Sequence, residues 1–271
     1  MQNQNDAIEL QKALIEGDNI NVPETNHVKD FLILIAGMCF IVLAFIMSFG
    51  FIADVFVTYM PDSAQMKIER LLAPDEDDYK VELQYQKELE RLNRIKRRIV
   101  RQDSSLNNKS ALPVYIYKNE NVNAFITPNG NIYVTTEAVK QRYSEEELTF
   151  ILAHEIGHYA HRDHLRMFSR TILIEYLFSA FFQDSSLKKV VNGITDMESL
   201  SHSRTQEKEA DKYAGLMLYK IYGRNKGGVD FINKIKEKEK SPEFLYYFST
   251  HPSWNERLEI LNEQKKMLAN S

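Results

Sequence analysis

The stretch LTFILAHEIGHYAHRDHLR at residues 148–166 sets two histidines four positions apart on what should be one helix. His154 and His158 then lie on the same helix face, so both imidazoles can reach one cation. Glu155 lies beside that cation without binding it. Zinc lowers the pKa of a bound water to about 7, and a neighbouring carboxylate can remove its proton. The pattern therefore predicts one Zn²⁺ per chain on His154 and His158, with Glu155 as the catalytic base.

A third protein ligand is expected, because catalytic zinc usually keeps three protein ligands and one open position. His164 has the spacing of HExxHxxGxxH sites, in which the glycine lets the chain leave the helix. Here His161 stands at that glycine position, which favours a helix that continues and carries His164 away from the metal. We interpret His161 as a histidine of the core or one that supports a ligand.

The other candidate for the third ligand lies in EKEAD at residues 207–211, at the start of a predicted helix. Glu207 and Asp211 share a helix face, so one can bind the metal while the other accepts a hydrogen bond from a ligand histidine. Arg204, just before them, is predicted to support this pair. An exposed acidic helix start, favoured by the helix dipole, is the alternative interpretation.

The rest of the chain predicts a mainly helical α+β domain with a small antiparallel sheet. The predicted strands cover residues 114–117, 124–127 and 132–135, with a Pro128-Asn129-Gly130 turn between the last two. Ser144 and Glu147 form a capping box that starts a helix ending near Asp163. Other helical patterns cover residues 81–99, 205–222, 229–239 and 253–268.

An apolar run from Phe31 to Ala53 predicts one transmembrane helix, because its length matches a hydrocarbon core of about 30 Å. It divides the chain into a polar tail (1–30), the membrane helix (31–53), a connector (54–77) and the main domain (78–271). The segment 165–182 is too interrupted by charges for a second span. Lysine and arginine are balanced across the run, so its orientation is open.

Composition argues against nucleic acid as a partner, because the net charge is −4 and gives no basic field. Cys39 is the one cysteine, which leaves neither a disulfide framework nor a thiolate metal site.

The predicted helix at 81–99 has a basic face. A solvated helix face is the simpler interpretation, and contact with acidic lipid headgroups is the alternative.

Four motifs in order resemble the membrane-associated gluzincin peptidases, the family that includes HtpX and the CAAX prenyl proteases, and especially bacterial members with one anchor. These motifs lie at residues 123–139, 148–166, 203–211 and 250–261. The resemblance implies zinc on His154, His158 and Glu207, with Glu155 as base. It also implies that a strand at Asn123, Ala124 and Phe125, or at 132–134, pairs with an extended substrate.

The resemblance also draws attention to His251. This imidazole is expected to donate to the developing oxyanion, to occupy the open zinc position in a latent state, or to serve a structural role. Relatives with many membrane helices share only the catalytic segment, so their prenylated substrates are not carried over.

We therefore predict a membrane-anchored zinc metalloendopeptidase with a gluzincin-like domain, acting on protein or peptide substrates, with the lipid bilayer as its other partner. By analogy with single-anchor relatives, the domain is expected on the outer, periplasmic side of a bacterial cytoplasmic membrane, in protein quality control. Two alternatives remain: a non-catalytic zinc-containing membrane adaptor, and an HExxHxxGxxH-like protease that uses His164 as its third ligand.

Overall fold

The computed structural model describes residues 26–71, 83–106, 112–170, 202–238, 240–251 and 254–269. The chain divides into two compact units, Met1–Ser48 and Phe49–Ser271. The predicted tail up to residue 25, the connector beyond residue 71 and the apolar segment beyond residue 170 lie outside the described residues.

The apolar run forms helix α2, His27–Thr58; most of the large apolar side chains described in it are exposed, whereas Val57 in its last turn is buried. Within the described part of the chain, α2 is the one helix long and apolar enough to cross a membrane. A second helix, α3 at Asp62–Leu71, occupies part of the predicted connector. It begins directly after Pro61, whose carbonyl accepts from the amides of Ala64 and Gln65.

The sheet has three strands in the order β1-β3-β2. They are β1 at Val114–Tyr117, β2 at Ala124–Ile126 and β3 at Ile132–Thr135. Strands β2 and β3 form the predicted antiparallel hairpin, closed by a turn in which Gly130 has a φ of 83°. Strand β1 differs from the prediction, because it pairs with β3 in parallel. The sheet is therefore mixed, and β2 lies at its edge.

The quoted stretch forms α6, Glu145–Ala160, which begins at the predicted capping box. Helix α9, Arg204–Tyr222, begins at a second capping box made by Ser203 and Gln206. The two helices pack closely at Gly157, where an added Cβ would lie 3.3 Å from the Cα of Ala210. The absence of a side chain at Gly157 thus lets the start of α9 approach the histidine-bearing turn of α6.

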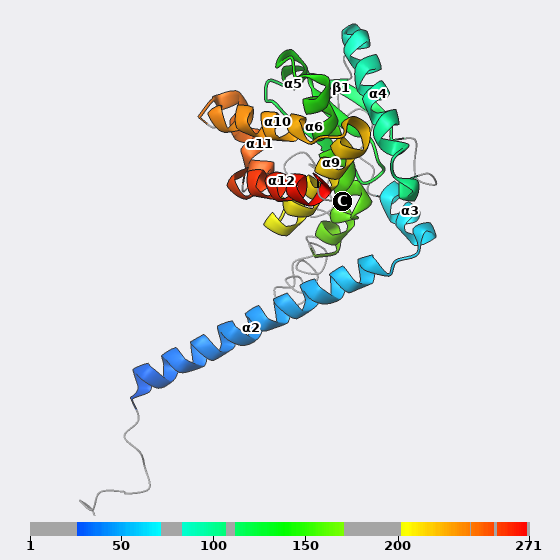
Figure 1. The fold of residues 1–271 in the computed structure, drawn as a ribbon. Helices are drawn as coiled ribbons and strands as arrows, with labels where there is room; N and C mark the ends of the chain where they lie inside the picture. The colour runs from blue at the N-terminus through cyan, green and yellow to red at the C-terminus, as the bar shows by residue number, and fades with distance from the viewer. Residues whose placement is uncertain are drawn as a thin grey trace, which may run out of the picture. The chain divides into compact units, whose positions relative to one another are not determined.

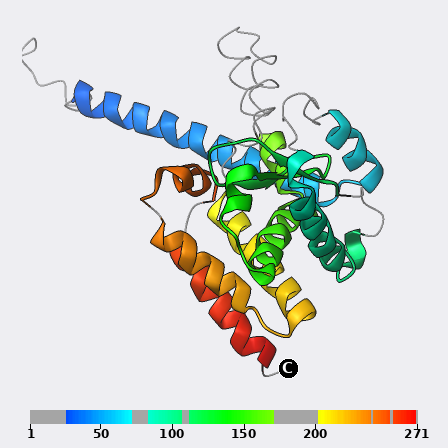
Figure 2. The same ribbon diagram turned by 90° about the horizontal axis from the view of Figure 1, so that it is seen from above.

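Figures 1 and 2 show α6 between the sheet on one side and α9 on the other. The remaining elements are η2 (Leu83–Tyr85), α4 (Gln86–Val100), η3 (Ser104–Leu106), α5 (Thr136–Lys140), α10 (Lys226–Glu237), α11 (Pro242–Thr250) and α12 (Trp254–Ala269). The mainly helical α+β prediction is confirmed, with one central core that α4, α6, α9, α10 and the sheet share.

The basic face of α4 is partly used inside this domain. Leu92, Ile95 and Ile99 bury the apolar side of the helix. Arg91 donates to the carbonyl of Tyr143, and Arg98 pairs with Glu145 at 2.6 Å. These contacts hold two of the arginines against the protein surface, so part of the basic face is used within the domain.

Candidate metal centre

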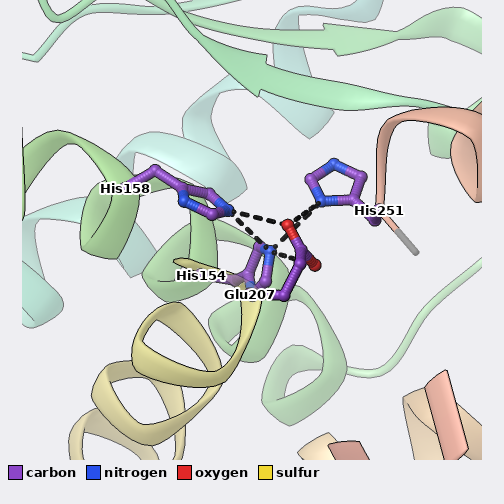
Figure 3. Close-up of side chains that lie close together, drawn as sticks. All are labelled: His154, His158, Glu207 and His251. Atoms are coloured by element: carbon purple, nitrogen blue, oxygen red, sulfur yellow. Dashed lines mark hydrogen bonds and ion pairs between the residues drawn. The ribbon is translucent and has the colours of Figure 1, made fainter. Parts of the chain in front are cut away.

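Three side chains from two helices bring their donor atoms together (Figure 3). The Nε2 atoms of His154 and His158, both on α6, are 3.1 Å apart. Glu207 on α9 places Oε2 at 3.5 Å from Nε2 of His154 and Oε1 at 3.3 Å from Nε2 of His158. All three side chains are buried. Together with His251 they form a group of donor atoms that is able to hold a metal ion, here called the metal-binding group.

The spacing of these atoms fits zinc. Tetrahedral ligands at about 2.0 to 2.1 Å from an ion are themselves about 3.3 Å apart, and the three separations, 3.1, 3.3 and 3.5 Å, lie around that value. Oε2 of Glu207 is buried and accepts no hydrogen bond, so this oxygen is left for a cation. Two imidazoles and a carboxylate are also a common donor set for catalytic zinc.

His251 joins the same group from the end of α11. Its Nδ1 lies 3.1 Å from Oε1 of Glu207 and 3.3 Å from Nε2 of His154. Its Nε2 lies 3.8 Å from Oε1 of Glu155. His251 therefore faces both the donor atoms and the predicted base.

Each ligand histidine is held through its other ring nitrogen. Nδ1 of His154 lies 2.9 Å from Oδ1 of Asp211, and Nδ1 of His158 lies 2.8 Å from Oδ2 of Asp163. Both carboxylates are buried. Such partners fix the tautomer and ring orientation of a ligand histidine, so that Nε2 is free for a metal.

The arginine in contact with Asp211 is Arg257 and not the predicted Arg204. Arg204 is exposed in the first turn of α9, seven residues and so about 10 Å along the helix axis before Asp211. Arg257 of α12 takes that position instead. Its Nε and Nη2 donate to the two carboxylate oxygens of Asp211, at 2.7 and 2.8 Å. The only sequence signal for Arg257 was its place in the fourth motif.

Sequence reasoning also missed two neighbours of His158. Asp163 follows it by five residues, within the quoted stretch, and His202 comes from the segment before α9. The His202 ring stacks on that of His158, with centroids 3.7 Å apart and planes 9° from parallel. Burial lowers the pKa of His202 well below its usual value, so this imidazole is neutral.

His164 lies outside the metal-binding group. We expected the helix to continue past His161, but α6 ends at Ala160 and Arg162 adopts a φ of 60°. The chain then turns, and Nε2 of His164 lies 3.3 Å from Oε1 of the buried Glu69. His161 lies against the ring of Tyr213 on α9, and burial lowers its pKa.

Burial and charge set the protonation of the donors. Burial lowers the pKa of His154 to about 4. Burial also acts against protonation of His158, but the carboxylates of Asp163 and Glu207 outweigh it and raise its pKa to about 10. A cation entering this group must therefore displace a proton from His158. Burial raises the pKa of Glu155 above its usual value.

A small cavity of about 20 Å³ adjoins the donor group. Glu155, His158 and His251 line one part of it, and residues of the β2 edge line another. Of the predicted substrate residues, Asn123 and Phe125 line the cavity, whereas Ala124 packs into the core. The Asn123 side chain is 1% exposed, and neither its amide nitrogen nor its oxygen is hydrogen-bonded.

Comparison with known proteins gives concordant matches. A sequence profile described as Peptidase family M48 matches residues 86–265. "Metalloendopeptidase OMA1, mitochondrial" of Homo sapiens is 29% identical over 168 residues, covering 55% of this chain and 31% of that protein. "Mitochondrial metalloendopeptidase OMA1" of Arabidopsis thaliana is 29% identical over 147 residues, covering 54% of this chain and 30% of that protein. The chain thus spans less than a third of the length of these curated relatives.

Proposed function

The chain belongs to peptidase family M48, and from that premise we propose that it is a membrane-anchored zinc metalloendopeptidase. Its substrates would be flexible or unfolded protein segments. One arrangement supports this activity above all: the donor atoms of His154, His158 and Glu207 converge beside Glu155, at a cavity that residues of β2 also line.

His154, His158 and Glu207 would hold one zinc ion. When bound, zinc would supply Lewis-acid chemistry, polarising a peptide carbonyl and acidifying a water. Glu155 would take the proton from the attacking water and pass it to the leaving amine. Asp211 and Asp163 would keep both ligand imidazoles in the required tautomer, with Arg257 holding Asp211 in turn.

The peptide would lie along β2, an outer strand of the sheet in the described part of the chain. Edge strands offer unpaired backbone groups, and an extended peptide that pairs with β2 would pass the cavity lined by Glu155 and His251. The side-chain amide of Asn123 is buried without a hydrogen bond. This costs free energy, and hydrogen bonds to a substrate backbone would relieve that cost. These contacts would select extended chains without selecting a particular side chain.

His251 would act in a latent form of the enzyme. Its Nδ1 lies 3.1 Å from Oε1 of Glu207 and 3.3 Å from Nε2 of His154, distances that would suit the fourth position on zinc. Substrate would then have to displace this imidazole. An oxyanion donor is the competing role, because Nε2 of His251 faces the Glu155 side of the cavity.

The purified full chain, solubilised in detergent, tests the activity. Casein should be cleaved, and a chelator should stop the cleavage. If neither the wild type nor a His251→Ala variant, which lacks the imidazole of the latent form, cleaved casein, that result would favour the non-catalytic adaptor. Glu155→Gln should retain about one zinc per chain and lose at least about 100-fold in turnover. Undiminished cleavage by that variant would exclude Glu155 as the base.

The third ligand is tested by a matched pair of variants. Glu207→Ala should lose zinc, whereas His164→Ala should retain it. The opposite outcome would establish the HExxHxxGxxH-like site. Both proteins should be compared at the same pH, because zinc competes with a proton at His158.

We also propose that α2 spans a bilayer, which makes lipid a partner of the chain. A bacterial cytoplasmic membrane with the domain on its outer side, and a role in protein quality control, stay predictions that rest on the resemblance. The two matched relatives are both named mitochondrial. Reporter fusions at the C-terminus would establish on which side the domain lies.

A further inference from the structure

The end of α2 is capped by the side chain of Arg162, which follows helix α6 in the chain. Carbonyls in the last turn of a helix have no partner within the helix. Nη1 of Arg162 donates to the carbonyls of Val57 and Met60, at 3.0 and 2.7 Å. Its Nη2 donates to Asp62, at the start of α3, at 2.8 Å. A planar, charged guanidinium can bridge such groups, and a cation is also favoured at a helix C-terminus.

Arg162 also has an unusual backbone conformation. Its φ of 60° lies in the left-handed region, which a side chain with a β-carbon disfavours. Such a conformation persists only where its surroundings hold it. Beside the guanidinium, Val57, Met60 and Leu165 form a buried apolar cluster that packs the same turn against the end of α2.

The next residue in the chain supports a metal ligand. Asp163 is buried and places Oδ2 at 2.8 Å from Nδ1 of His158. One residue further, His164 lines the metal cavity and meets Glu69 of α3. Three consecutive residues therefore connect the end of the anchor helix, a ligand histidine and the cavity wall.

We propose that Arg162 is a positioning residue of the metal centre: by clamping its turn to the end of α2, it sets Asp163 against His158. This inference rests on the proposed function, because it assumes that His158 binds zinc. If Arg162 has this role, the end of α2 contributes to the geometry of the metal centre. An intact clamp then raises zinc affinity, and a broken clamp lowers it.

The test measures zinc affinity of the full chain in detergent by competition with a chromophoric chelator. Loss of a residue that orients a ligand typically weakens metal binding about 10- to 100-fold. Asp163→Asn should fall in that range, and Arg162→Ala should weaken binding about tenfold, toward its lower end. Arg224→Ala, which removes an exposed arginine paired with Glu146, is the matched control and should bind zinc like the wild type.

Two further variants separate the clamp from the turn. Glycine tolerates a positive φ, so Arg162→Gly keeps the turn and loses only the guanidinium; it should weaken binding as much as Arg162→Ala. Arg162→Lys keeps the charge without the planar fork and should recover part of the affinity. Wild-type affinity in Arg162→Gly would show that the turn alone places Asp163, and would overturn the clamp.

A double-mutant cycle decides whether Arg162 acts through Asp163. In the Asp163→Asn background, Arg162→Gly should cause no further loss of zinc affinity. Independent, multiplicative losses would overturn the proposed route. A wild-type chain that binds no zinc would overturn the proposed function itself, whereas normal wild-type binding with unchanged Arg162 variants would overturn this inference alone.

Discussion

Replacement of Arg257 by methionine should destabilise the fold far more than loss of an ordinary arginine. Arg257 is 1% exposed and gives two hydrogen bonds to Asp211, which is itself fully buried. Removing one partner of a buried pair leaves the other charge uncompensated, at a cost of about 3 to 5 kcal/mol. For a domain of this size, that cost corresponds to a fall in Tm of roughly 6 to 20 °C.

The measurement is thermal unfolding of the full chain in detergent, followed by circular dichroism with a chelator present so that zinc does not contribute. Arg224→Met is the control, because Arg224 forms an exposed pair with Glu146; its Tm should change by about 2 °C or less. Replacing Asp211 and Arg257 together by apolar residues should cost less than either single change. A Tm shift in Arg257→Met no larger than in the control would refute the reasoning.

Two further predictions concern latency and acid stability. His251→Ala should raise casein cleavage about tenfold if the latent form holds nine-tenths of the chains, whereas a fall of about 100-fold would assign His251 to the oxyanion. Burial would raise the pKa of Glu147, but Lys234 at 2.6 Å and the Ser144 cap lower it. Because the folded-state pKa is the lower one, this stabilisation is present at neutral pH and is lost as pH falls through it. Lys234→Met should therefore lower Tm at pH 7, and the gap to the wild type should narrow as pH falls below the usual Glu pKa of about 4.3; a gap that does not narrow would contradict this.

Local signals made the metal-binding helix predictable from sequence. The capping box of Ser144 and Glu147 involves residues three positions apart, and the two histidines, His154 and His158, are four positions apart. Helix α11 carried such a signal in Pro242 at its first turn, but the signal was not used. Strand β1 was different, because its parallel pairing with β3 depends on the path of the intervening chain and not on either strand's pattern.

Contacts between distant segments set the limit of prediction at the site. Arg204 was chosen because it precedes Glu207 in sequence, yet the guanidinium on Asp211 comes from Arg257, forty-six positions away. Asp163 was hidden for another reason. A turn at Arg162 without glycine contradicts the usual residue preference, and the contacts that hold it come from the end of α2.

Charge balance explains why such a site can be buried at all. Four carboxylates that surround the donor group are buried: Glu155, Asp163, Glu207 and Asp211. Among the residues that the structure describes, Arg257 is the permanently charged cation paired with two of them, Glu207 and Asp211. Protonation of His158, whose pKa is raised to about 10, offsets part of the remaining charge, and the pKa of Glu155 is shifted in the same direction. A divalent ion that replaces the His158 proton supplies more positive charge at the same point. The excess of buried carboxylates in this pocket is thus a second reason to expect a metal ion. This reason does not depend on the four-residue spacing of His154 and His158.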